Sequence, residues 1–175
     1  MTQIDGPRTI AASEAEAILR RLPEWFGIES ALLAYAAEAQ VLPNFAAKLN
    51  GAIVGFVSLR QHNSVTVEMT CLAVAPDVHR RGIGTRLCAA AEAWWYERGG
   101  RLVQVKTLGP SRPSLSYERT RRFYEARGFL PVEEFTNLWP GNPCLLLIKA
   151  ISEPAACLAC NGTPQEGYDG SCAPH

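Results

Sequence analysis

The chain has 175 residues, of which 47% are hydrophobic and 19% are charged, and its formal net charge at pH 7 is zero. This composition predicts one domain with one core, and the balanced charge excludes a domain-wide basic field of the kind that gathers nucleic acid. We expect no membrane partner, because no apolar run approaches the roughly 20 residues of a membrane helix and the N-terminus lacks a signal-peptide layout. A cytoplasmic location is expected.

Two helices are predicted in the first forty residues. The segment 13–21 begins at Ser13 and has Glu16 three residues later, which is the pattern of a capping box with Ser13 as N-cap. A second helix is expected over 28–40, where apolar residues recur at helical spacing.

The rest of the chain is predicted as a sheet with two more helices. Strands at 45–49 and 52–59 are joined by Asn50-Gly51, a strong signal for a two-residue hairpin turn. The later elements are expected, in chain order, as a strand at 65–74, a helix at 82–98, a strand at 102–108, a helix at 117–127 and strands at 130–135 and 144–150. The order ααβββαβαββ predicts an α/β fold, a mixed sheet with helices on both faces.

The loop from His79 to Gly84 carries the strongest functional signal. It follows an apolar strand and opens a helix, so backbone N–H groups and the positive end of the helix dipole point to one place. Gly82 and Gly84 lack a Cβ, so a ligand can lie against the main chain, and Arg80 and Arg81 add positive charge. The third glycine of a dinucleotide fingerprint and the Gly-Lys-Ser/Thr of a P-loop are both absent. The loop therefore predicts a phosphate site of another kind.

The sequence of this loop, His-Arg-Arg-Gly-Ile-Gly, resembles the Gln/Arg-x-x-Gly-x-Gly/Ala signature of the GNAT superfamily of N-acetyltransferases, with His in place of Gln or Arg. Residues 123–129, Phe-Tyr-Glu-Ala-Arg-Gly-Phe, resemble the aromatic-Tyr-x-x-x-Gly-Phe block of the same family. The resemblance covers about residues 8–150 and implies the GNAT fold, with a splayed cofactor cleft in the sheet. It also implies acetyl-CoA as co-substrate, a primary amine of a small molecule or peptide as acceptor, and direct transfer.

The resemblance assigns roles to individual residues. It implies that the following residues contact acetyl-CoA: Leu72, Ala73, Val74, Arg80, Arg81, Gly82, Ile83, Gly84 and Thr85. Tyr124 would give a proton to the departing thiolate, with a half-buried tyrosine as the alternative. Glu68 would deprotonate the amine, directly or through water, with a solvated acid as the alternative. Strand alternation would place Glu68, Thr70 and Leu72 on one face of the sheet.

The acceptor pocket is expected between the loop that joins the first two helices and the loop before the last strand. Its candidate walls are Trp25, Phe26 and Trp139, with ordinary core packing as an equal alternative. The sequence does not identify the acceptor amine or the acyl chain, and it leaves a homodimer open.

Residues 1–150 are expected to form the acetyltransferase domain, and residues 151–175 a cysteine-containing tail. The tail residues Cys157, Cys160, Cys172 and His175 have the spacing of a zinc ligand set. The last ligand would be the terminal residue and nothing hydrophobic would close over the site, so a flexible tail without metal is expected. The alternative function for the whole chain is a non-catalytic acyl-CoA-binding sensor or interaction module on the same fold.

Overall fold

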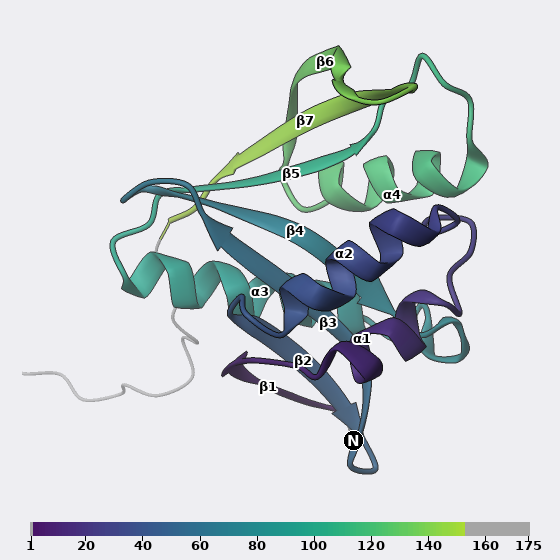
Figure 1. Cartoon of the computed structure of the whole chain (residues 1–175). Coiled ribbons are helices and arrows are strands. Elements are labelled where there is room, and N and C mark those ends of the chain that lie inside the picture. The colour runs from purple at the N-terminus through teal and green to yellow at the C-terminus, as the bar shows by residue number, and fades with distance from the viewer. Residues whose placement is uncertain (1, 153–175) are drawn as a thin grey trace, which may run out of the picture.

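The structure is a computed structural model that describes residues 2–152, which form a seven-stranded sheet and four α-helices (Figure 1). The strands are β1 (Gln3–Arg8), β2 (Asn44–Leu49), β3 (Ala52–Gln61), β4 (Thr66–Val74), β5 (Leu102–Leu108), β6 (Leu130–Trp139) and β7 (Asn142–Ala150). The helices are α1 (Ala12–Leu19), α2 (Glu29–Ala39), α3 (Ile83–Glu97) and α4 (Leu115–Glu125), with a short 3-10 helix η1 (Pro76–Val78). The strand order is β1-β2-β3-β4-β5-β7-β6, and all neighbours are antiparallel except β4 and β5. The mixed α/β sheet predicted from the sequence is confirmed.

The helices cover both faces of the sheet (Figure 1). One core cluster lies between the sheet and helices α3 and α4 and includes the fully buried Leu59, Leu87 and Val103. The other lies between the sheet and helices α1 and α2 and includes Leu19 and Phe56. The central strand β3 is buried from Phe56 to Leu59 and apolar there except for Ser58, whereas β4 and β5 alternate polar and apolar residues over 66–71 and 103–106. Within residues 2–152, every helix is too short or too polar to cross a membrane.

The first strand, β1, was not predicted. Its sequence, QIDGPR, carries the turn formers Gly6 and Pro7 and only one large apolar side chain. The strand forms because its backbone pairs with β2 at the edge of the sheet, where proline is tolerated. Asp5 adds an ion pair across that edge, 2.8 Å from Lys48. The element order is therefore βααβββαβαββ.

Two helices begin earlier than predicted. α1 begins one residue before Ser13 and has no side-chain cap, so the predicted capping box is wrong. Glu16 instead accepts a hydrogen bond from Arg20, one turn further along, at 2.7 Å. α4 begins two residues early because the Ser114 hydroxyl accepts a hydrogen bond from the Tyr117 N–H and caps the helix.

A bulge interrupts β4 at Thr70. Ser58 of β3 is opposite Cys71 and Leu59 is opposite Met69, so Thr70 has no partner on β3. An extra residue reverses the alternation of side chains that follow it. Met69 therefore belongs to the core under α3, whereas Cys71 belongs to the core under α1 and α2.

Because of the bulge, Glu68, Thr70 and Leu72 do not share one face of the sheet, so that prediction is wrong. Glu68 and Thr70 line a pocket together with residues of α2, whereas Leu72 contacts the core cluster under α3. Period-two alternation holds only within an unbroken strand, and the extra residue lies between Glu68 and Leu72.

The sheet divides between β4 and β5. The two strands pair over Thr66–Glu68 and Leu102–Gln104 and then separate, whereas β5 remains paired with β7 to Leu108. Figure 1 shows β5 diverging from β4 toward the carboxyl end of β5, with the antiparallel β7 beside it. The splayed cleft expected from the family resemblance is present. Of the predicted tail, only residues 151 and 152 are described, and the candidate zinc ligands lie outside the described residues.

Candidate active site

The loop before α3 has the geometry of an anion site. Gly82 is the N-cap of this 15-residue helix and has a φ of 71°, in the left-handed region that favours glycine. A Cβ at Gly82 would meet no atom within 4 Å, so the space beside this backbone is open. The first N–H groups of a helix have no partner within it, and here they belong to residues 83–85. An anion fits this position with the helix dipole behind it.

Positive charge surrounds this helix terminus. Arg80 and Arg81 are exposed beside Gly82, and Arg80 itself adopts a φ of 60° although it carries a Cβ. Such strained conformations cluster at binding loops. His79, at the position where the family signature has Gln or Arg, lies 2.6 Å from the Val74 carbonyl oxygen through Nε2. A carbonyl oxygen only accepts, so Nε2 carries a proton, and the ring ties the loop to the end of β4.

The remaining loop residues contribute in different ways. Ile83 is buried, which leaves only its N–H to face a ligand, whereas Thr85 is exposed. A Cβ at Gly84 would lie 3.2 Å from the ring of Phe123, so the structure explains this glycine by the close packing of α4 on α3. The ligand approach predicted for Gly84 is better supported at Gly82.

β4 has one edge without a strand partner beyond Glu68. Leu72, Ala73 and Val74 pair with β3 on one edge, and the pairing with β5 on the other edge has already ended. Backbone N–H and C=O groups on such an edge can bond an extended ligand as an added strand would. These three residues, which the family resemblance predicts to contact acetyl-CoA, therefore lie on the open edge of the cleft.

Tyr124 lies in a nearly dry environment. Only 6% of its surface is exposed, and its ring centroid lies 5.3 Å from that of Phe123 and 5.4 Å from that of Phe129. Burial, with a further contribution from the thiols of Cys88 and Cys71, raises the pKa of Tyr124 well above 10. The phenol is thus protonated throughout the neutral range.

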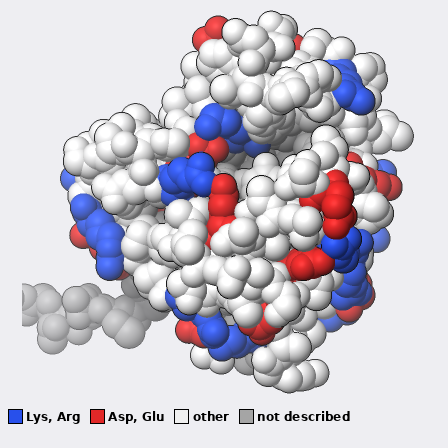
Figure 2. All heavy atoms as spheres, in the orientation of Figure 1, with Lys and Arg blue, Asp and Glu red and all other residues white. Residues whose placement is uncertain are grey.

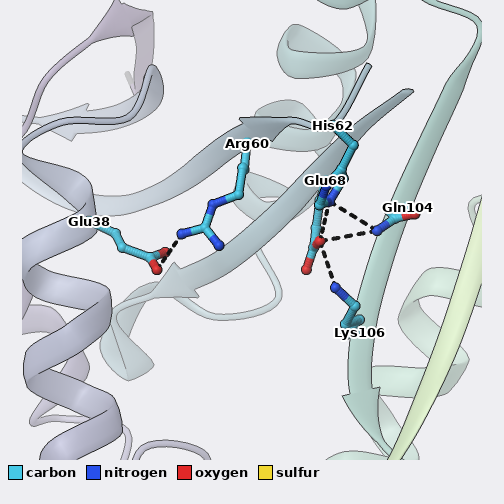
Figure 3. A network of polar contacts seen from close by, with 6 residues as sticks. All are labelled: Glu38, Arg60, His62, Glu68, Gln104 and Lys106. Carbon is cyan, nitrogen blue, oxygen red and sulfur yellow. Dashed lines mark hydrogen bonds and ion pairs between the residues drawn. The ribbon is translucent and has the colours of Figure 1, made fainter. Parts of the chain in front are cut away.

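Glu68 is held by three side chains at the point where β4 and β5 separate (Figure 3). Its Oε2 lies 2.6 Å from His62 Nε2, 3.0 Å from Gln104 Nε2 and 2.8 Å from Lys106 Nζ. Burial alone would raise the pKa of Glu68, but the hydrogen bonds from Lys106, His62 and Gln104 outweigh it and hold the pKa below its usual value. The carboxylate is therefore anionic at neutral pH.

Glu68 lines a cavity of about 190 Å³ at the head of the cleft. The cavity is bounded by residues of α2, β3, β4, β5 and β6: Tyr35, Glu38, Arg60, Glu68, Thr70, Lys106 and Trp139. The structure thus places Trp139, one of the three predicted pocket walls, beside Glu68. We refer to this cavity as the Glu68 pocket.

The other two predicted wall residues do not line the Glu68 pocket. Trp25 Nε1 donates a hydrogen bond to Thr120 Oγ1 at 2.9 Å, and the Trp25 carbonyl accepts one from the Tyr117 hydroxyl at 2.9 Å. Trp25 therefore fastens the α1–α2 loop to α4. Phe26 packs edge-on against Tyr35, with ring centroids 5.7 Å apart, and so supports a residue that lines the pocket.

Four residues of the Glu68 pocket were missed by the sequence analysis: Tyr35, Glu38, Arg60 and Lys106. Tyr35 and Glu38 are three residues apart on α2, so they share a helix face, and this spacing was a usable signal. Arg60 lies opposite Glu68 in the β3–β4 register, and Lys106 is two residues beyond Gln104 on β5. Those two neighbours become evident only when the strand order is known.

The model of the acetyltransferase (GNAT) family matches residues 12–129. The chain belongs to the GNAT family of acetyltransferases. The matched range of this GNAT chain includes Glu68, Tyr124 and the loop from His79 to Gly84, which we refer to as the phosphate-type loop. A search of curated proteins finds no match.

Solved structures support the GNAT fold. A GNAT-family protein from Desulfovibrio desulfuricans is 18% identical with a TM-score of 0.72, over 87% of this chain and 100% of that chain. The ribosomal-protein-S18-alanine N-acetyltransferase of Escherichia coli is 20% identical with a TM-score of 0.70, over 90% and 99%. An aminoglycoside 6'-N-acetyltransferase complexed with coenzyme A is 22% identical with a TM-score of 0.67, over 87% and 99%. At these identities the likeness shows a shared fold.

Proposed function

We propose that the chain moves an acetyl group from acetyl-CoA to a primary amine of a small molecule or peptide by direct transfer. The observation that carries this proposal is the division of the sheet after Glu68 and Gln104. It leaves one open strand edge, at Leu72–Val74, between the phosphate-type loop and the Glu68 pocket. The relative solved with coenzyme A supports the choice of co-substrate.

The proposed contacts with acetyl-CoA follow from the open surfaces of the cleft. Its phosphates would meet the N–H groups of residues 82–85 and the guanidinium groups of Arg80 and Arg81, and its extended arm would lie along 72–74. When bound, acetyl-CoA supplies an activated acyl group and a thiol leaving group. The open space beside Gly82 and the free edge of β4 fit these parts of the molecule.

Two side chains are proposed to handle protons. Tyr124 holds a proton for the sulfur that leaves, because burial keeps the phenol protonated at neutral pH. Glu68 accepts the proton of the amine, directly or through water. All three of its contacts within residues 2–152 fall on Oε2, so Oε1 is available to the acceptor.

The test is acetyl-CoA consumption, read as free thiol, across a panel of amines, amino acids, polyamines, aminoglycosides and N-terminal peptides. We expect acceptor-dependent thiol release, and Tyr124→Phe should lower kcat about 100-fold while the Kd for coenzyme A stays within about twofold. Saturable coenzyme A binding with no thiol release for any acceptor would contradict the enzyme and favour the acyl-CoA sensor.

The setting of the enzyme is also a proposal. We propose an acetyltransferase domain over residues 1–150, which agrees with the end of β7 at Ala150. A cytoplasmic location is supported by Cys71, Cys88 and Cys144, which are buried free thiols. The balanced net charge supports a partner other than nucleic acid.

A further inference from the structure

The Glu68 pocket contains two acids and two bases. Glu38 Oε1 and Arg60 Nη2 form one ion pair at 2.5 Å, and Glu68 Oε2 and Lys106 Nζ form the other at 2.8 Å. Figure 3 shows these four side chains reaching in from α2, β3, β4 and β5. Figure 2 shows basic and acidic groups meeting where this face of the molecule is hollowed. Because the four formal charges cancel, the pocket has no net field that would draw in a polycation.

Several oxygen atoms of the pocket have no partner within the described residues. Glu38 Oε2 and Thr70 Oγ1 are buried and make no hydrogen bond there. Oε1 of Glu68 is also free, since the three donors around this carboxylate bind Oε2. Buried polar atoms without a partner are costly, so a ligand that donates hydrogen bonds is favoured at this position. An ammonium group, with three N–H donors, supplies them.

The pocket also holds donors that are not used. Arg60 places one nitrogen, Nη2, on Glu38, although a guanidinium has five N–H donors in a planar fork. Lys106 has three N–H donors, one of which is placed on Glu68. The planar guanidinium of an arginine can donate two parallel hydrogen bonds to a carboxylate, so Arg60 is better suited than Lys106 to bind a ligand carboxylate.

The pocket is small and suits a small acceptor group. Its volume of about 190 Å³ is below the roughly 300–1,000 Å³ of sites that enclose drug-sized ligands. Aminoglycosides and polyamines carry several ammonium groups, and the surplus charges would face Arg60 and Lys106. A small acceptor that carries one positive and one negative charge matches both the volume and the charges.

We propose that the acceptor is a free amino acid, whose amino group lies among Glu68, Glu38 and Thr70 and whose carboxylate is held by Arg60. The inference rests on the proposed acetyltransferase function and names its substrate class. The nitrogen forms a bond to the acetyl carbon as the C–S bond of the thioester breaks. The ammonium loses two protons overall, one to the thiol sulfur and one to solvent.

The experiment compares matched acceptors that differ only in the carboxylate: an L-amino acid, its α-amide and its decarboxylated amine. For the wild-type chain we expect kcat/KM for the free acid to exceed that for each of the other two at least about tenfold, which corresponds to the loss of one charge-assisted contact. In Arg60→Gln this preference should fall about tenfold, mainly through a higher KM for the amino acid. Arg60→Lys should retain part of it because the charge is kept without the fork.

Arg20→Gln is the matched control, since Arg20 is the C-cap of α1, also forms ion pairs with carboxylates and does not line the Glu68 pocket. It should keep the wild-type preference, and circular dichroism and Tm should show that each variant is folded. Equal turnover of the free acid and its amide by the wild type, or a preference unchanged in Arg60→Gln, would overturn the proposal and leave the acetyltransferase function intact.

The same acceptors are also tested for binding to the coenzyme A-loaded protein by saturation-transfer NMR. Selective binding of the free acids without any thiol release would support the pocket assignment and contradict the enzyme. If the free acids show neither turnover nor selective binding, that result would contradict both the acetyltransferase function and the pocket assignment.

Discussion

Removing the Lys106 ammonium tests whether Glu68 is held as a buried carboxylate. In Lys106→Met the side chain keeps its unbranched shape but loses its charge, 2.8 Å from Glu68 Oε2. Breaking a fully buried ion pair costs about 3–5 kcal/mol. The Lys106 side chain is 26% exposed and two other donors remain on Glu68, so we expect a loss of about 2 kcal/mol at pH 7. For a chain of this length that corresponds to a Tm lower by about 4–8 °C.

The lowered pKa of Glu68 determines how the stability loss in Lys106→Met depends on pH. Because the pKa of Glu68 is lower in the folded state than in the unfolded state, the interactions of its carboxylate contribute stability above the unfolded pKa of about 4.3. That contribution disappears as the pH falls through the folded pKa. The substitution raises the folded pKa, so the stability difference between wild type and Lys106→Met should be largest at neutral pH and shrink below about pH 4.

The assay is urea unfolding of both proteins at pH 7 and at a series of acidic pH values. Lys48→Met is the control, because the Lys48–Asp5 pair has the same 2.8 Å distance but joins β2 to the edge strand β1, with both side chains partly exposed. It should cost less than about 1 kcal/mol. A loss at pH 7 no larger than in the control, or a loss that is the same at pH 7 and at pH 3, would refute the account of Glu68.

Two further predictions concern the cleft. Gly82→Val places a side chain in the open space before α3 and should raise the Kd for coenzyme A at least about tenfold by isothermal titration calorimetry, whereas Gly99→Val, at a similarly open left-handed glycine after α3, should share the backbone strain of about 1–2 kcal/mol without weakening binding. Equal weakening by both would remove the phosphate site from this loop. The raised pKa of Tyr124 predicts that kcat shows no loss from its ionisation up to about pH 10; a fall between pH 8 and 9 that vanishes in Tyr124→Phe would contradict this.

Local backbone chemistry explains the parts of the fold that the sequence predicts well. The Asn50-Gly51 hairpin forms as expected because both residues adopt left-handed φ values, 51° and 85°, which these residue types tolerate. α3 ends at Glu97, and Gly99, two residues later, adopts a left-handed φ of 85° that terminates the helix. The phosphate-type loop was identifiable because its glycines, arginines and helix start are consecutive in the chain.

The parts that were missed depend on contacts between distant segments. β1 forms through pairing with β2 and not through its own pattern, and the bulge at Thr70 is a property of the β3–β4 register. The Glu68 pocket draws on five separate elements, so Glu38 and Arg60 could not be recognised as neighbours before the sheet was assembled. Trp25 was a candidate wall of the acceptor pocket, with ordinary packing as an equal alternative, and the structure shows its indole N–H donating to Thr120 Oγ1.

The short pairing between β4 and β5 divides the sheet into two parts, β1–β4 and β5–β7. The backbone pairing between these two parts covers three residue pairs and stops at Glu68 and Gln104. Beyond these pairs, β4 and β5 are connected by side chains, because the Lys106 ammonium donates a hydrogen bond across the widening gap to the Glu68 carboxylate. The contact between the two parts of the sheet at this point therefore depends on the carboxylate that we propose as the base. If the acceptor binds Glu68 as proposed, it would also alter this contact between β4 and β5.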